Sequence, residues 1–93
     1  MQIQMTDHAR SRIQQRGIPE PVIEGLLSFG RTMHDHHGSE VLYFDHQARS
    51  VLRKTWGNET YKRLEAKLDA YAVLAADGSV ITVGHRTKRI VRH

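Results

Sequence analysis

Residues 70–83 read AYAVLAADGSVITV, and this stretch decides the fold class. Two runs rich in apolar and β-branched residues, 70–75 and 80–83, flank four turn-forming residues. Asp77-Gly78 between two such runs is a strong signal for a tight turn that joins antiparallel strands. The sequence therefore predicts a β-hairpin close to the end of the chain.

The chain ahead of the hairpin begins with helical patterns. Thr6 and Asp7 are good N-cap residues, and Gly17 is the residue type that closes helices in the left-handed conformation, so a helix is predicted over residues 8–16. A second helix starts at two prolines and ends at Gly30, because prolines are tolerated in a first turn. It carries one apolar stripe, made of Val22, Ile23, Leu26 and Leu27.

The middle of the chain alternates between strand and helix signals. Residues 31–39 are typical of an edge strand that runs into a turn, and residues 41–44 are typical of a second strand. Asp45 can cap a third helix that ends at Gly57, and a fourth helical segment starts at Asn58. Apolar residues recur at helical spacing in these two segments: Ala48, Val51, Leu52 and Trp56, then Tyr61, Leu64 and Leu68.

Together these elements predict an α+β fold, with N-terminal helices packed on a small antiparallel β-sheet that ends in a C-terminal hairpin. Residues 1–5 alternate polar and apolar side chains and are interpreted as one more short strand, while residues 84–93 either continue the last strand or fray. The large aromatic residues are expected in the core rather than in a base-stacking platform: Tyr43, Phe44, Trp56 and Tyr71.

Composition limits the classes of protein that remain. The chain has 93 residues, of which 39% are hydrophobic and 26% charged, and this is ordinary for one globular domain over residues 1–93. No segment approaches the roughly 20 apolar residues that span a bilayer, and no secretory signal is recognisable. Cysteine is absent, which excludes disulfides, a thiol nucleophile and cysteine-based zinc sites. We expect a cytoplasmic protein.

The net charge of +4 is unevenly distributed along the chain. Residues 1–16 carry three arginines against one acid, and residues 85–93 carry four basic residues and no acid. The middle holds seven basic against nine acidic residues, which leaves −2. A basic end of this kind is either a solvated tail or a patch that binds phosphate groups.

The first predicted helix presents a row of polar residues that suits phosphodiester chemistry. His8 and Arg12 are four residues apart and Gln15 or Arg16 follows one turn later, so they share a helix face. A neutral imidazole can take the proton of a 2′-hydroxyl, while a guanidinium neutralises the charge that develops on the phosphate oxygens. The ordinary alternative is that His8 assists the helix cap and the arginines solvate the outer face.

A second cluster lies at the end of the hairpin. In a strand, Thr82 and Arg86 point to one face and His85 to the other, so His85 and Arg86 share a pocket only if the strand bends at Gly84. Further basic residues follow and are candidates for nucleic-acid contacts: Lys88, Arg89 and Arg92. The alternative is a solvated basic tail.

A third cluster is rich in histidine. Residues 34–37 read His-Asp-His-His and His46 follows, a spacing that could hold two ligands of a transition metal on one strand face. No residue pattern supplies the rest of a ligand shell, so we predict no metal site. No phosphate-binding loop, dinucleotide glycine motif or serine nucleophile signature occurs, and we predict no cofactor.

The residues of these clusters match a known pattern. Residues 8–12 (His-Ala-Arg-Ser-Arg), Gln15-Arg16-Gly17-Ile18 and the closing Val80-Ile81-Thr82-Val83 resemble the small bacterial domain-of-unknown-function family 4258. That family is grouped with the barnase, EndoU, colicin and RelE-type ribonuclease toxins. The resemblance covers nearly the whole chain and implies a RelE/barnase-like domain.

The resemblance implies a ribonuclease that needs no metal, uses the 2′-hydroxyl of RNA as internal nucleophile and leaves a 2′,3′-cyclic phosphate. His8, Arg12 and Arg16 match the first-helix signature, and Thr82 matches the threonine of the last strand. We therefore predict an endoribonuclease toxin in which His8 or His85 exchanges protons and Arg12 and Arg86 hold the phosphate. Its expected partners are RNA and an antitoxin protein with an acidic segment. The alternative is a non-catalytic module that binds nucleic acid or an acidic protein.

Overall fold

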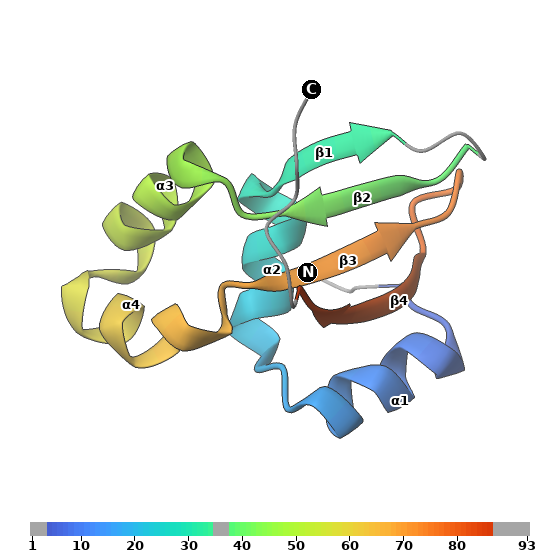
Figure 1. Ribbon diagram of the computed structural model, residues 1–93, viewed down its shortest axis with the longest axis horizontal. Helices are drawn as coiled ribbons and strands as arrows, with labels where there is room; N and C mark the ends of the chain where they lie inside the picture. The colour runs from blue at the N-terminus through green and yellow to red at the C-terminus, as the bar shows by residue number, and fades with distance from the viewer. Residues whose placement is uncertain (1–3, 35–37, 87–93) are drawn as a thin grey trace.

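The computed structural model describes residues 4–34 and 38–86, and Figure 1 shows their arrangement. The helices are α1 (Asp7–Arg16), α2 (Glu20–Phe29), α3 (His46–Trp56) and α4 (Asn58–Leu64), followed by the 3₁₀ turn η1 (Glu65–Lys67). The strands are β1 (Arg31–His34), β2 (Glu40–Tyr43), β3 (Ala70–Leu74) and β4 (Val80–His85). They form one antiparallel sheet in the order β1-β2-β3-β4, so the predicted α+β fold is confirmed.

The helix ends follow the capping residues. The hydroxyl of Thr6 accepts the backbone N–H of Ala9 at 3.1 Å, and the carboxylate of Asp45 accepts that of Ala48 at 2.8 Å. Gly17 ends α1 with φ 62°, a left-handed conformation in which a Cβ would be strained. Such residues are favoured at helix ends because the first and last turns leave backbone N–H and C=O groups without partners inside the helix. The helix ends could therefore be predicted from the sequence.

The β3–β4 hairpin turns at the predicted residues. Gly78 has φ 88°, and the carboxylate of Asp77 accepts the backbone N–H of Ser79 at 2.9 Å. This bond and a side-chain bond from Ser79 lower the pKa of Asp77. Because the folded pKa is lowered, the ionised turn stabilises the fold above the ordinary pKa of Asp77 and loses this contribution as the pH falls through the lowered value.

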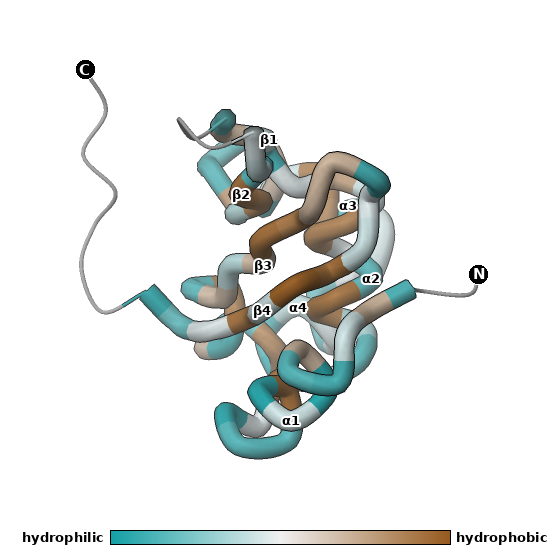
Figure 2. The backbone as a smooth tube through the Cα atoms, turned by 90° about the vertical axis from the view of Figure 1, so that its right-hand side faces the viewer, coloured by the Kyte–Doolittle hydropathy of each residue, from teal (hydrophilic) through white to brown (hydrophobic). Residues whose placement is uncertain are grey.

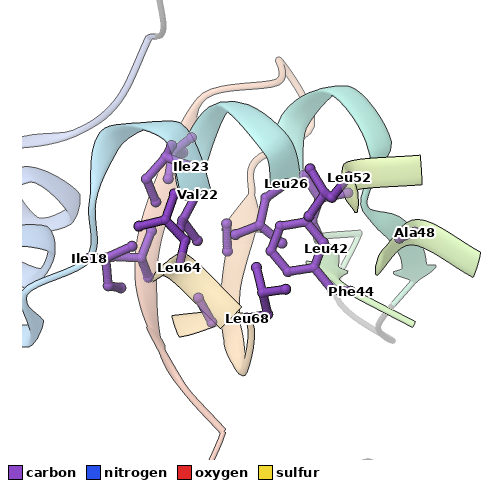
Figure 3. Close-up of a cluster of buried hydrophobic side chains, with 14 of the residues drawn as sticks. Ile18, Val22, Ile23, Leu26, Leu42, Phe44, Ala48, Leu52, Leu64 and Leu68 are labelled. Carbon is purple, nitrogen blue, oxygen red and sulfur yellow. The ribbon is translucent and has the colours of Figure 1, made fainter. Parts of the chain in front are cut away.

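The register of the sheet separates two faces. The inner face carries Leu42, Ala72 and Val83, which pair in one row across three strands and lie under α2 (Figure 1). Figure 3 shows how α2 and the loop before it fill the core against this face. The outer face is the opposite side of the sheet and carries the alternate residues: Arg31, Met33, Val41, Tyr43, Tyr71, Val73, Thr82 and Gly84. Of the helices in the described ranges, α2 is the one that crosses the sheet, and it covers the inner face.

The outer edge of β4 is covered by the start of the chain. The backbone N–H of Val80 donates to the carbonyl of Gln4 and that of Thr6 donates to the carbonyl of Val80, both at 2.9 Å. The Thr6 hydroxyl also donates to the carbonyl of Ile81 at 3.0 Å. Helix α1 then runs beside β4, where Ala9 is fully buried. Of the strand predicted for residues 1–5, the structure has a parallel bridge between Met5 and Val80, and residues 1–3 lie outside the described residues.

Two packing expectations differ from the structure. Val51 continues the apolar spacing of α3 but is 37% exposed, because α2 packs on the flank of α3 that holds the buried Leu52, and Val51 lines an open hollow beside Phe29. Tyr71 was expected in the core but lies half-buried on the outer face of β3. Alternation along a strand decides its position, since its neighbours Ala70 and Ala72 take the inner face.

The packing of α2 predicts a large and site-specific loss of stability. Replacement of the fully buried Leu26 by alanine should lower the free energy of unfolding by about 2–5 kcal/mol, because a cavity opens under the sheet. The matched control is Met33→Ala on β1, where the side chain is 36% exposed and the change should stay within about 0.5 kcal/mol. Urea unfolding of both variants measures the difference, and equal losses would contradict the core position of α2.

Candidate nucleic-acid interface

One row of outer-face residues runs across all four strands. The register pairs Arg31 with Tyr43, Tyr43 with Tyr71, and Tyr71 with Gly84, so these four residues are direct cross-strand neighbours. The row holds a guanidinium, two phenols and a position without a side chain. Basic and aromatic groups in one line are the combination that holds the phosphates and the flat faces of nucleotides.

Arg86 extends this row by lying on Tyr43. Its guanidinium carbon is 5.2 Å from the centre of the Tyr43 ring, a cation–π distance, and Tyr43 is only 6% exposed beneath it. The Nε atom of Arg86 is buried without a hydrogen-bond partner among the described residues. This contact holds the guanidinium over the outer-face residue Tyr43, where its remaining N–H groups can meet an anion.

Gly84 gives room for Tyr71. A Cβ at position 84 would lie 2.9 Å from the phenolic oxygen of Tyr71 and 3.0 Å from a ring carbon, which is closer than real Cβ contacts allow. The phenol therefore lies directly over the backbone of β4. A bend at Gly84 was the condition for His85 and Arg86 to share a pocket, but the register runs regularly from Tyr71–Gly84 to Ala70–His85. Close approach of an aromatic ring, rather than a bend, explains this glycine.

Because β4 stays straight here, its candidate site residues divide between the two faces. Thr82, Gly84 and Arg86 alternate on the outer side, and His85 pairs with Ala70 on the inner side. Thr82 is half-buried beside Val73. The structure therefore brings Thr82 and Arg86 to one face and does not bring His85 together with Arg86.

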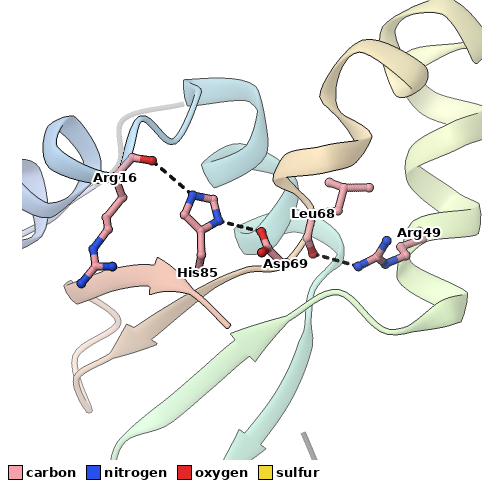
Figure 4. Close-up of polar contacts among 5 residues, drawn as sticks. All are labelled: Arg16, Arg49, Leu68, Asp69 and His85. Atoms are coloured by element: carbon pink, nitrogen blue, oxygen red, sulfur yellow. Dashed lines mark hydrogen bonds and ion pairs between the residues drawn. The ribbon is translucent and has the colours of Figure 1, made fainter. Parts of the chain in front are cut away.

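His85 is held by two acceptors (Figure 4). Its Nδ1 lies 2.6 Å from a carboxylate oxygen of Asp69, and its Nε2 lies 3.2 Å from the backbone carbonyl oxygen of Arg16. A carboxylate and a carbonyl only accept hydrogen bonds, so both contacts are satisfied together when the ring carries a proton on each nitrogen. His85 thus joins the end of α1 to the start of β3. We call this set of three residues the His85 clamp.

The clamp is continuous with a second tether. The backbone N–H of Arg86 donates to the carbonyl of Asp69 at 2.9 Å, and the guanidinium of Arg49 donates to the carbonyl of Leu68 at 3.2 Å (Figure 4). Residues 68 and 69 therefore connect α1, α3 and β4. The role of Asp69 was missed, since a lone acid before a strand carries no signal of a partner sixteen residues away.

Helix α1 presents the other predicted residues beside β4. Ala9 and Ile13 pack on the core. His8 directly precedes Ala9 and Arg12 directly precedes Ile13, so both lie on the same flank of α1, about 100° around the helix axis from the buried residues. His8 is exposed and Arg12 half-buried. Within residues 4–34 and 38–86, neither side chain makes a hydrogen bond or an ion pair with another described residue. Figure 2 shows that most of α1 is hydrophilic, in contrast to β3 and β4.

Several predicted site residues fall elsewhere. The side chain of Arg16 is exposed and extends away from His85, while its carbonyl joins the clamp (Figure 4). The candidate contacts Lys88, Arg89 and Arg92 lie outside the described residues, as do three members of the histidine cluster, Asp35, His36 and His37. His34 lies 3.6 Å from a carboxylate oxygen of Glu40, and the described residues hold no group of three or more potential metal ligands.

Comparison with known proteins gives no relative. No family model, no curated protein and no solved structure matches the chain significantly. In the described part of the chain, every helix is too short or too polar to cross a membrane.

The His85 clamp predicts a measurable coupling between Asp69 and His85. Replacing either residue by alanine should weaken the attachment of α1 to the sheet, and the two losses should not add, because both remove the same contact. The coupling energy should be about 1 kcal/mol, modest since both side chains are partly exposed. A double-mutant cycle on urea unfolding measures it, and strictly additive losses would show that the contact contributes nothing.

Proposed function

We propose that this protein binds RNA across the outer face of its sheet and cleaves the RNA backbone beside α1, without a metal. The observation that carries the proposal is the cross-strand row Arg31-Tyr43-Tyr71-Gly84 with Arg86 stacked on Tyr43. It supplies two guanidiniums for phosphates and a phenol surface for bases on a face that no helix of the described residues crosses.

The chemistry of cleavage is assigned to the flank of α1. In this proposal His8 takes the proton of the 2′-hydroxyl, whose oxygen then attacks the adjacent phosphorus and forms a 2′,3′-cyclic phosphate. The P–O5′ bond breaks and the 5′-oxygen leaves with a proton from water or a protonated side chain. Arg12 neutralises the charge that builds on the phosphate oxygens, and Thr82 can donate a hydrogen bond to them.

In this proposal His85 does not act as a general acid or base. A general acid or base needs a ring nitrogen that faces the substrate, and both nitrogens of His85 contact Asp69 and Arg16 on the inner side of β4. His85 is instead a positioning residue, because it fixes the end of the helix that carries His8 and Arg12.

The clamp also favours a second candidate function, an RNA-binding module without cleavage. If His85 is a structural residue, His8 is the one of the two candidate histidines that remains for proton transfer. Binding through Arg31, Arg86 and Tyr71 would be unaffected. In either case, an acidic protein segment would compete for the same basic surface, as expected of an antitoxin.

Cleavage of a labelled RNA by the purified protein distinguishes the two functions. The His8→Ala variant should lower the rate about 100- to 10,000-fold in the presence of a chelator, because the proton acceptor is lost while the RNA still binds. Arg12→Ala should lower the rate as well, and Arg12→Lys should restore part of it.

The matched control is His46→Ala, which removes an equally exposed histidine from the start of α3. It should leave the rate unchanged. Full activity of the His8→Ala variant would contradict the assignment of the base. RNA that binds to the wild type and stays intact would instead support the module that only binds.

A further inference from the structure

The two helices that pack beside the sheet carry a concentration of positive charge. Residues 46–67, which form α3, α4 and η1, contain six basic and two acidic residues. We call this segment the basic lobe; its cations are Arg49, Arg53, Lys54, Lys62, Arg63 and Lys67. Its net charge of +4 is as large as that of the whole chain.

These cations lack acidic partners. The ion pairs among the described residues are Arg31–Asp45, His34–Glu40 and His85–Asp69, and none of them uses a cation of the basic lobe. Arg49 is engaged with a backbone carbonyl, and the Arg53 guanidinium lies 4.9 Å from the centre of the Tyr61 ring. Three more are exposed and have no contact of this kind with another described residue: Lys54, Lys62 and Arg63.

Two cations of the basic lobe have a spacing at which like charges repel. Arg49 and Arg53 are four residues apart on α3, whereas Lys54 and Lys62-Arg63 lie in the last turns of α3 and α4, where the helix dipole favours positive charge. Like charges at this spacing repel one another and destabilise a helix. A bound anion would relieve this repulsion. An open hollow of about 570 Å³ lies between α3 and α4, but its lining is mixed in charge, since Arg53 and Lys62 share it with Glu59 and Glu65, so the hollow itself is not an anion site.

Lys67 connects the basic lobe with α1. A Cβ built on Gly17, directly after α1, would lie 3.9 Å from the ammonium nitrogen of Lys67. Arg16 is the neighbour of Gly17 and its side chain is exposed. The positive surface therefore runs from α1 past Lys67 to α4, although these segments are some fifty residues apart in the sequence.

From this continuity we infer that the basic lobe is a second contact surface for RNA, which holds the phosphate backbone of a strand that also passes α1. The choice of RNA as the ligand rests on the proposed function. The cations without ion pairs, and the positive surface that runs from α1 to α4, are independent of it. Contacts of this kind bind through charge, so they add affinity without sequence preference and weaken steeply with salt. A long polyanion fits better than a small one, since the cations are spread over three helical segments.

The test compares two triple variants of the three exposed cations. Lys54→Gln/Lys62→Gln/Arg63→Gln removes the charge, and Lys54→Arg/Lys62→Arg/Arg63→Lys retains it. Binding of a fluorescent single-stranded RNA of about 20 nucleotides is measured over a range of salt concentrations, and thermal unfolding checks that both variants are folded. For three lost phosphate contacts, the slope of log Kd against log salt should fall by about 2 with the neutral variant and stay unchanged with the charged variant.

Two further readouts separate this inference from the proposed function. A dinucleotide substrate is too short to reach from α1 to α4, so the neutral variant should cleave it like the wild type while its affinity for long RNA falls at least several-fold. A changed salt slope in a protein that never cleaves RNA would refute cleavage and support the basic lobe. An unchanged salt slope in the neutral variant would overturn the inference. Displacement of the RNA by polyglutamate at equal charge concentration would also overturn it, and would favour an acidic protein partner.

Discussion

Strand β4 is held from both sides, and the rest of the candidate site depends on this constraint. On one side it pairs with β3 through a tight hairpin, and on the other the backbone of Gln4 and Thr6 bonds to Val80. The second set of bonds fixes where α1 begins, and the His85 clamp fixes where it ends. An edge strand that would otherwise expose its backbone is thereby covered. The same contacts hold α1, the helix that carries His8 and Arg12, beside the strand that carries Thr82.

The alternation of β4 assigns different tasks to neighbouring residues. His85 turns inward and serves the attachment of α1, whereas Arg86 turns outward and lies on Tyr43. A strand without a bend cannot present both to one ligand. This division is economical for a domain of this size, in which few side chains are available. Under the proposed function, loss of His85 would therefore affect RNA indirectly, through the position of α1, and loss of Arg86 directly.

Local chemistry made the elements predictable from the sequence. Caps such as Thr6, Asp45 and Gly17, and the Asp77-Gly78 turn, act over a few residues, so their signals can be read along the chain. The predicted α+β arrangement followed because helices with one apolar stripe need a sheet to cover. The contacts that define the site are long-range, and no local pattern encodes them. Tyr71 over Gly84, Arg86 over Tyr43 and Asp69 beside His85 each depend on strand register, which pattern alone does not fix.

Charge gives the clearest example of what a linear description hides. Divided along the sequence, the middle of the chain carries −2 and looks unsuited to a polyanion. Most of its acids lie outside the basic lobe: Asp45 and Glu40 pair with β1, and Asp69 with β4. The charge of these three acids is therefore used by other elements, and no ion pair among the described residues involves the cations of α3 and α4. Since Lys67 then adjoins the end of α1, folding converts an acidic middle segment into part of a continuous basic surface. The electrostatic character of this domain is a property of its topology, and its composition alone understates how strongly one side could attract RNA.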